Sequence, residues 1–522
     1  MNLEAETGDE LAPARPRRWR WIVPLVVVAA FAVAFGVARK RRGFDPRKSP
    51  VGDALGRTVP AYVVALGAWA TGRSPDADLV RAKALALSSE ARAALGNDAA
   101  AEVDHLLESA TTLARVQERP LPPGTTDPFL AATTALDQRL AARGLPYFVD
   151  TDVLLRGAHA LPLVVTFYVE REEERLVDDQ RERVVFLWRL DRLNFRDDYL
   201  GYTRPRLGAA VVLYDELESD LVRYVLPAVP AGERVELVDD ESRDDGAAWQ
   251  DEVETRAAAI IRADYAGASP AERDAAVRVG KLLARRRELV KKWRRQIAGL
   301  GLRLRVPERL VPEADYAEDL ARRIPRGELS EWDELHDELT SKEGEAAFRL
   351  LRDRYAAAVA RHELQHRADY RRGLVPVPVP LQRALGIPSG LDAPEGSRAA
   401  RAREELSAYL ASMATPGLGA RRELVLLTRF LFDRRSWGYP YCDAAFVALA
   451  EIGKELGVPD IEPLSSRGTL LRGRATKVLV AITDRPDEDV RAAAERAWER
   501  MYDAKLPTIG TVKAVENARW RH

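Results

Sequence analysis

A long amphipathic pattern runs through residues 344–373, where apolar side chains recur at steps of three and four residues. Its apolar stripe consists of Phe348, Leu351, Tyr355 and Val359. This spacing is typical of one face of an α-helix. His362 and His366 continue the stripe, and Gly373 and Pro376 then supply a stop. We therefore predict one helix that presents both imidazoles on the same side.

A second helix is predicted downstream, over residues 397–414. Two neighbouring stripes run along it, Leu406, Leu410 and Met413 toward a core and Glu405, Tyr409 and Ser412 beside them. The periodicity is again helical, so the polar stripe has a defined direction relative to the core. Glu405 is therefore available to a site that this helix helps to form.

The rest of the chain favours a mainly helical α+β fold. Runs rich in β-branched and aromatic residues predict strands at 163–169, 184–190 and 209–213. The first two are joined as a long hairpin, which indicates an antiparallel sheet packed on helices. The predicted domains behind the N-terminus are a helical region (51–143), an accessory α+β domain with the antiparallel sheet (144–240) and a helical region that contains both motif helices (250–522).

The N-terminus favours a membrane anchor. Residues 1–20 form a polar tail, and residues 21–38 are uncharged and apolar, which is long enough for a transmembrane helix. Trp19 and Trp21 lie where an interfacial aromatic belt is expected. The basic run 39–42 follows at once, which argues against a cleaved secretory signal. We predict a single-pass membrane protein that contacts the membrane through this helix.

The distribution of charge bears on the orientation in the membrane and on the class of partner. Four Lys or Arg residues precede the apolar run and six follow it up to Lys48, which favours a cytoplasmic catalytic region and leaves the opposite orientation open. The net charge of −1 argues against a nucleic-acid partner. Cys442 is the only cysteine, so no intramolecular disulfide is expected.

His362, Glu363 and His366 have the spacing HExxH. On a helix this spacing places two imidazoles on one ion, and the glutamate projects beside them as a general base. Histidine is rare here, six in 522 residues, so a chance HExxH is expected roughly once in a hundred such sequences. The alternative interpretation is a solvated helix face without metal, because Arg361 and Arg367 flank the motif.

A catalytic zinc ion (Zn2+) has three protein ligands, so a third is required on another helix. Glu405 is the predicted third ligand, and Glu404 is a possible substitute whose alternative role is a solvated helix charge. Asp369 is predicted to accept the second N–H of a ligand histidine, since ligand histidines commonly donate to a carboxylate.

Together, His362-Glu363-x-x-His366-x-x-Asp369 and the later Glu405-x-x-Ala408 resemble the gluzincin group of metallopeptidases. They are most similar to the branch that contains anthrax lethal factor and the Mlc titration factor peptidase. The resemblance implies zinc on His362, His366 and Glu405, with Glu363 as the base. Zincins also carry a small sheet whose edge strand pairs with substrate. Here the predicted sheet lies some 150 residues before His362, so we assign it to the accessory domain.

Many gluzincins take their oxyanion donor, a histidine or a tyrosine, from beside or beyond the third-ligand helix. After His366 the only histidine is His522 at the end of the chain, so a tyrosine is expected. Tyr409, Tyr439 and Tyr441 are the candidates. The alternative for each is a core position with a locally bonded hydroxyl.

The sequence thus predicts a membrane-anchored zinc metallopeptidase that hydrolyses peptide or protein substrates. The competing hypothesis is a membrane-anchored scaffold whose zinc site is structural or vestigial. A structural site does not need a base, so the presence of Glu363 favours the enzyme.

Overall fold

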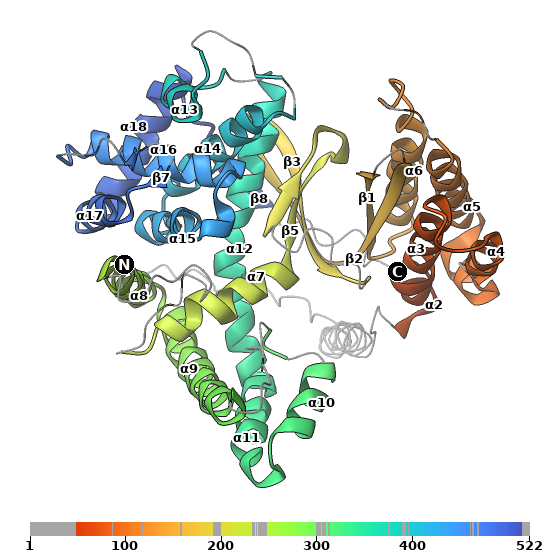
Figure 1. Cartoon of the computed structure of the whole chain (residues 1–522), viewed down its shortest axis with the longest axis horizontal. Coiled ribbons are helices and arrows are strands. Elements are labelled where there is room, and N and C mark those ends of the chain that lie inside the picture. The colour runs from red at the N-terminus through yellow and green to blue at the C-terminus, as the bar shows by residue number, and fades with distance from the viewer. Residues whose placement is uncertain are drawn as a thin grey trace, which may run out of the picture.

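The structure is a computed structural model, and it describes most of the chain from Lys48 to Lys513. The residues within that span that it does not describe are 86, 117, 119, 157–158, 192–199, 232–234, 236, 238–247, 299–303, 305–308, 312–313, 374–375, 389–392, 395, 460, 462–463 and 467–468. The described part is mainly helical, with one curled sheet between two groups of helices (Figure 1).

The predicted transmembrane helix and the single-pass localisation require correction. No helix in the described part of the chain combines the length and the apolar character needed to cross a membrane. The described part of the fold is therefore mainly helical with a sheet, and it does not contain the membrane-spanning helix on which the predicted localisation rested. Residues 1–20 and 21–38 themselves lie outside the described residues.

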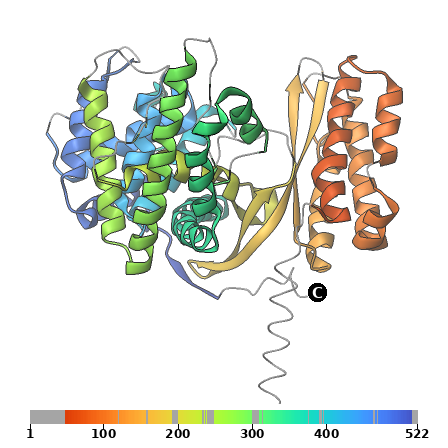
Figure 2. The same ribbon diagram turned by 90° about the horizontal axis from the view of Figure 1, so that it is seen from below.

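The first group of helices precedes the sheet. It comprises α2 (Pro50–Asp53), α3 (Val59–Ala70), α4 (Asp76–Leu85), α5 (Ser89–Ala114) and α6 (Asp127–Ala142), with a π-helical turn at Ala54–Thr58. Apolar side chains of these helices pack on one face of the first two strands and form a core with Tyr147, Val149 and Val164. Figure 2 shows this group against the outer side of the sheet.

The sheet has the strand order β1-β2-β3-β5-β4. Its strands are β1 (Tyr147–Arg156), β2 (His159–Val177), β3 (Gln180–Arg189), β4 (Gly201–Thr203) and β5 (Ala209–Leu213), with β8 (Ile509–Lys513) paired to the end of β2. The predicted long hairpin is confirmed, because β2 and β3 pair antiparallel. The predicted antiparallel sheet is wrong in one pairing, since β3 and β5 run parallel.

The sheet curls enough to enclose a core of its own. Ten buried residues that all lie on strands form this core: Phe148, Val165, Phe167, Val169, Val185, Leu187, Tyr202, Ala209, Val211 and Leu213. Side chains alternate between the two faces of a strand, so Val184, Phe186 and Val212 face the opposite way, into the main core. The curl also brings Arg204, just after β4, to the Thr151 carbonyl oxygen of β1 at 3.1 Å.

The second group of helices follows the sheet. It comprises α7 (Tyr214–Asp220), α8 (Ala248–Ala266), α9 (Pro270–Ala298), α10 (Ala314–Arg323), α11 (Ser330–Thr340), α12 (Lys342–Arg371), α13 (Val379–Leu385), α14 (Arg398–Ala414), α15 (Ala420–Phe432), α16 (Pro440–Glu455), α17 (Arg472–Thr483) and α18 (Asp487–Tyr502). Short 3-10 turns lie at Pro205–Leu207, Leu226–Ala228, Arg326–Glu328 and Arg434–Ser436, a π turn lies at Leu221–Val225, and β6 (Ser465–Ser466) pairs with β7 (Thr469–Leu470). Helix α12 runs through the middle of the molecule and packs on the sheet, α9 and α14 (Figure 1).

Candidate metal centre

Two capped helices carry the site. Ser341 accepts a hydrogen bond from the Gly344 N–H at 3.0 Å and so starts α12, and Ser397 accepts from the Ala400 N–H at 3.2 Å and starts α14. Gly373 lies just past α12 with a φ of +73°, a left-handed conformation that favours glycine. The predicted helices 344–373 and 397–414 correspond to these two elements.

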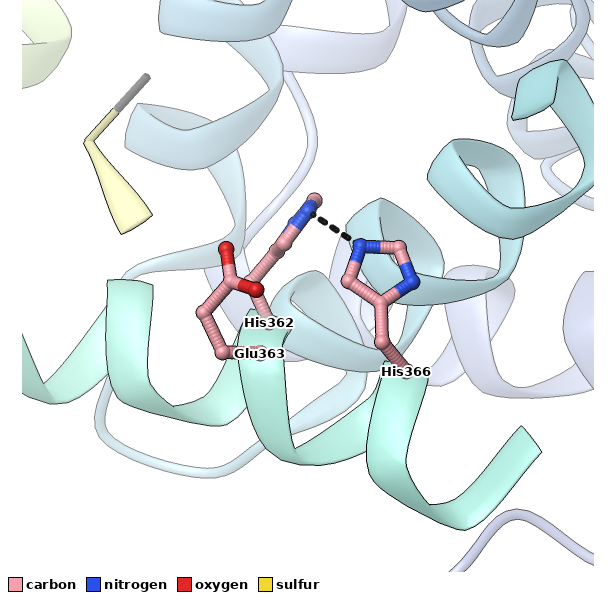
Figure 3. A group of neighbouring side chains, drawn as sticks. All are labelled: His362, Glu363 and His366. Atoms are coloured by element: carbon pink, nitrogen blue, oxygen red, sulfur yellow. Dashed lines mark hydrogen bonds between the residues drawn. The ribbon is translucent and has the colours of Figure 1, made fainter. Parts of the chain in front are cut away.

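His362 and His366 point toward each other from successive turns of α12, with the Glu363 carboxyl group beside His362 (Figure 3). The two Nε2 atoms lie 3.1 Å apart, and the rings meet edge to face with centroids 4.8 Å apart. One candidate ligand atom from each of His362, Glu363 and His366 lies within 4.8 Å of the others. Two nitrogens on one tetrahedral zinc ion are separated by about 3.3 Å, so the histidine pair fits a shared ion.

The third predicted ligand faces this pair. The Glu405 Oε2 atom on α14 lies 3.5 Å from the His362 Nε2 atom. Its neighbour Glu404 instead forms an ion pair with Arg403 at 3.0 Å. The structure thus distinguishes the two adjacent carboxylates, and Glu405 is the one that can complete a set of ligands with the histidines.

The electrostatics of the site favour neutral forms of Glu363 and His366 and the ionised form of Glu405. Burial, together with a smaller contribution from His362, lowers the pKa of His366 to about 3, so His366 is held as the neutral imidazole that binds metal. Burial raises the pKa of Glu363 well above its usual value, and the Glu405 charge adds to this. Burial alone would raise the pKa of Glu405, but the hydrogen bonds from His362 and Tyr409 and the charges of the two histidines together outweigh burial and lower that pKa.

Buried polar atoms lack partners here. The Glu363 Oε2 and His366 Nδ1 atoms are buried without a hydrogen bond, and Glu363 has no ion pair with any described residue. A buried polar atom without a partner costs free energy and is uncommon in folded proteins. A nearby dication would favour the ionised form of Glu363, whereas the His366 Nδ1 atom is on the other side of its ring from the Nε2 atom that faces His362.

Asp369 lies on the buried side of α12, but its observed partner is not a ligand histidine. Its Oδ1 atom accepts from the Gln365 Nε2 atom at 2.8 Å, whereas the Asp369 Oδ2 and His366 Nδ1 atoms have no partner. The hydrogen bond that we predicted from a ligand histidine to Asp369 is therefore not formed by His366. Burial raises the pKa of Asp369 to about 6, although hydrogen bonds from Ser407 and Gln365 counteract this.

The arginines that flank the motif are not solvated. Arg361 is 4% exposed and donates to the Thr415 hydroxyl at 2.9 Å and to the Pro507 carbonyl oxygen at 3.3 Å. Arg367 pairs with the buried Glu182 of β3 at 2.9 Å. Both arginines therefore hold α12 in place, and the interpretation of the motif as a solvated helix face is wrong.

The structure separates the three candidate tyrosines. The Tyr409 ring lies 4.6 Å from the His362 ring, and its hydroxyl hydrogen-bonds Glu405. Tyr439 is 53% exposed and stacks on Tyr441 with ring centroids 5.4 Å apart. Of the three, Tyr409 is the one whose contacts, with His362 and Glu405, place it at this site.

Strand β4 is a part of the site that sequence reasoning missed. A Cβ atom on Gly201 would lie 2.9 Å from the Glu363 Cγ atom and 2.6 Å from the Val211 carbonyl oxygen, so only glycine permits this approach. The sheet that we assigned to an accessory region thus packs directly on α12. A glycine in a short strand-like run was the available signal, since it marks close approach of two backbones.

Tyr370 is a second residue that sequence reasoning missed. It lies one helical turn after His366 on α12, and its phenol is partly buried. Burial raises its pKa well above the usual value, and the charges of Glu404 and Glu363 raise it further. The four-residue step from His362 to His366 and then to Tyr370 was the signal that could have identified it.

Comparison with known proteins identified no relative of this chain. No protein-family model, no curated protein and no solved structure matches the chain. The functional argument therefore rests on the geometry of the site.

Proposed function

We propose that the chain is a zinc-dependent metallopeptidase that hydrolyses peptide bonds in peptide or protein substrates. The observation that carries the proposal is the pair of Nε2 atoms 3.1 Å apart, with the Glu405 Oε2 atom 3.5 Å from one of them. Two imidazoles and one carboxylate are the ligand set of catalytic zinc in the HExxH peptidases that the sequence resembles.

His362, His366 and Glu405 would hold the zinc ion. When bound, the ion supplies Lewis-acid chemistry that polarises a carbonyl group and acidifies water. Glu363 would take a proton from the attacking water and pass it to the leaving amine, a task that suits a carboxylate whose pKa is raised by burial. Tyr409 would donate a hydrogen bond to the oxyanion that develops on the substrate.

The sheet gives the proposal a place for substrate. In zincins a strand beside the active-site helix pairs with an extended substrate chain, and β4 lies beside α12 next to Glu363. We infer that an extended peptide approaches Glu363 along this strand. Main-chain hydrogen bonds to a strand impose little sequence preference, so selectivity would come from side-chain contacts.

The test compares the purified full-length chain with a Glu363→Gln variant and a Glu404→Gln control. Both changes replace one carboxylate by an amide, but Glu404 pairs with Arg403 rather than facing the histidines. Zinc is measured by elemental analysis, and cleavage by mass spectrometry on a mixture of tryptic peptides. We expect one zinc per chain in all three, and a loss of turnover of about 10²–10⁴-fold in Glu363→Gln alone.

Two results would count against the enzyme. Equal turnover by Glu363→Gln and the unchanged chain would show that Glu363 is not the base. Stoichiometric zinc without cleavage by any of the three proteins would favour the competing hypothesis, a scaffold with a structural or vestigial zinc site.

A further inference from the structure

A buried polar stripe runs along α12 beside the histidine stripe. Arg361 donates to the Gln365 Oε1 atom at 3.0 Å, and Gln365 donates to the Asp369 Oδ1 atom at 2.8 Å. The three residues are spaced by four and are at most 4% exposed. Their side chains therefore form one continuous chain of hydrogen bonds in the core, where each bond restricts the positions of its neighbours.

The stripe joins α12 to the ligand helix α14 at two points. Gln365 donates to the Ser407 hydroxyl at 3.4 Å, and Arg361 donates to the Thr415 hydroxyl at 2.9 Å. Ser407 and Thr415 are separated by eight residues, which is about 12 Å along a helix. Two directional contacts at this separation fix the translation and the rotation of α14 against α12, which apolar packing alone does less strictly.

Helix α18 holds α14 on both sides of the third ligand. The Tyr502 hydroxyl donates to the Arg403 carbonyl oxygen at 3.0 Å, and the Trp498 Nε1–H donates to the Ser407 hydroxyl at 2.9 Å. Arg403 and Ser407 lie two residues before and two residues after Glu405. Trp498 is 0% exposed and Tyr502 is 5% exposed, so water does not compete for these bonds.

We propose that Trp498 and Tyr502 are positioning residues that set the place of Glu405 relative to the histidine pair. They touch neither the ligand atoms nor substrate, and they act through Ser407 and the backbone of α14. The proposal rests on the proposed zinc site and adds an element, α18, that no motif marks. It implies that zinc affinity depends on hydrogen bonds made about a hundred residues after Glu405.

The test uses Tyr502→Phe and Trp498→Phe in the full-length chain, with Tyr355→Phe as the matched control. Like the two α18 residues, Tyr355 is buried and donates a hydrogen bond, to Asp220 at 3.0 Å. It lies on α12, two turns before His362, and so away from the third ligand. Zinc affinity is measured by competition with a chelator, and ligand geometry by the visible absorption spectrum of the cobalt-substituted protein. Thermal unfolding of the metal-free proteins reports the purely structural effect.

We expect Tyr502→Phe and Trp498→Phe to bind zinc about 10–100-fold more weakly and to shift the cobalt spectrum, as for other residues that orient metal ligands. Tyr355→Phe should lose comparable thermal stability and keep the affinity and the spectrum of the unchanged chain. Ser407→Ala combined with Trp498→Phe should weaken zinc no more than the larger single effect, because both remove the same bond.

The outcomes separate the two proposals. If the unchanged chain binds zinc and both variants match its affinity and spectrum, the positioning role is overturned and the metallopeptidase proposal stands. If Tyr355→Phe weakens zinc as much as the two variants do, the effect is general loss of stability and the positioning role is again overturned. If the unchanged chain binds no zinc, both proposals fail.

Discussion

Helix α12 crosses two buried polar clusters that differ in how their charges are paired. In the first, around Tyr355, Asp220 pairs with Arg429 at 2.8 Å and accepts the Tyr355 hydroxyl at 3.0 Å. Nearby, Asp264 pairs with Arg422 at 2.6 Å. In the second cluster, around His362 and two turns further on, Glu363 has no ion pair with any described residue.

The pKa shifts favour charged arginines in the first cluster and neutral forms of Glu363 and His366 in the second. Burial alone would lower the pKa values of Arg422 and Arg429, but their acidic and phenolic neighbours together outweigh burial and raise both, with Asp264 and Asp220 the largest contributors, so the charged forms are stabilised. Around His362, burial raises the pKa of Glu363 and lowers that of His366, so neutral forms are favoured. The first cluster is complete in itself and contributes to stability. In the second, buried polar atoms of Glu363 and His366 have no partner, and perturbed pKa values of this kind are common at functional sites.

The largest expected effect is on the second cluster. A His362→Ala, His366→Ala double variant removes two of three ligands, so zinc affinity should fall at least about 10³-fold, equivalent to roughly 4 kcal/mol. Elemental analysis after dialysis measures this. Stoichiometric zinc retained by the double variant would show that the metal, if any, binds elsewhere.

The first cluster should respond in the opposite way, with a loss of stability and no loss of zinc. Asp220→Ala leaves the Arg429 guanidinium buried without its carboxylate, which should cost about 3–5 kcal/mol of unfolding free energy while zinc stays bound. Asp484→Ala breaks the exposed pair with Arg256 and is the control, with an expected cost below about 1 kcal/mol. Loss of zinc from Asp220→Ala at temperatures where the protein is folded would mean that the two clusters are not independent.

A pH measurement sharpens the contrast. Asp369 has a pKa of about 6 in the fold against an ordinary 3.8, so the folded state favours its protonated form. This stabilisation is full below pH 3.8 and is lost as pH rises through about 6, a loss of up to about 3 kcal/mol. Metal-free Asp369→Asn lacks this loss, so its stability relative to the unchanged chain should rise between pH 4 and pH 7. If the unfolding free energies of the two proteins change in parallel from pH 4 to pH 7, the raised pKa of Asp369 is excluded.

The smallest effect concerns the oxyanion donor. Tyr409→Phe should lower kcat by about 100-fold, equivalent to about 2.7 kcal/mol, with zinc still bound. Tyr439→Phe is the control, because that side chain is exposed and stacks on Tyr441. Single-turnover kinetics on a cleaved peptide measure both. If neither change alters kcat, a further group such as Tyr370 is the next to test.

The sequence predicted what depends on neighbours along one helix. The spacing of His362, Glu363 and His366 determined their common side of α12, and the stripe through Glu405 and Tyr409 determined their side of α14. These relations follow from 3.6 residues per turn and need no knowledge of the tertiary fold. The facing of the two helices was inferred from the need of a catalytic zinc ion for a third protein ligand and then from the resemblance, and not from the hydrophobic pattern.

The sequence pattern could not predict which distant residues contact each other in the fold. Arg361 was interpreted as a possible solvated charge because its Pro507 contact lies 146 positions away, and Arg367 because its Glu182 partner lies 185 positions away. The sheet was assigned to a separate region for the same reason, although Gly201 packs on Glu363. A buried arginine and an exposed one look the same in a hydrophobic pattern, because the pattern does not record the partner that neutralises the charge.

The hydrogen bonds of α18 can also form only late in synthesis of the chain, after both helices that carry the site. A ribosome completes α12 and α14, with all three proposed ligands and the base, well before it makes Trp498, Tyr502 and Pro507. If these late residues set the position of Glu405, the nascent chain carries every catalytic group without the arrangement that uses them. If the chain is the peptidase proposed above, this order would delay activity until α18 has folded against the rest, which would protect the emerging chain and its neighbours from premature cleavage.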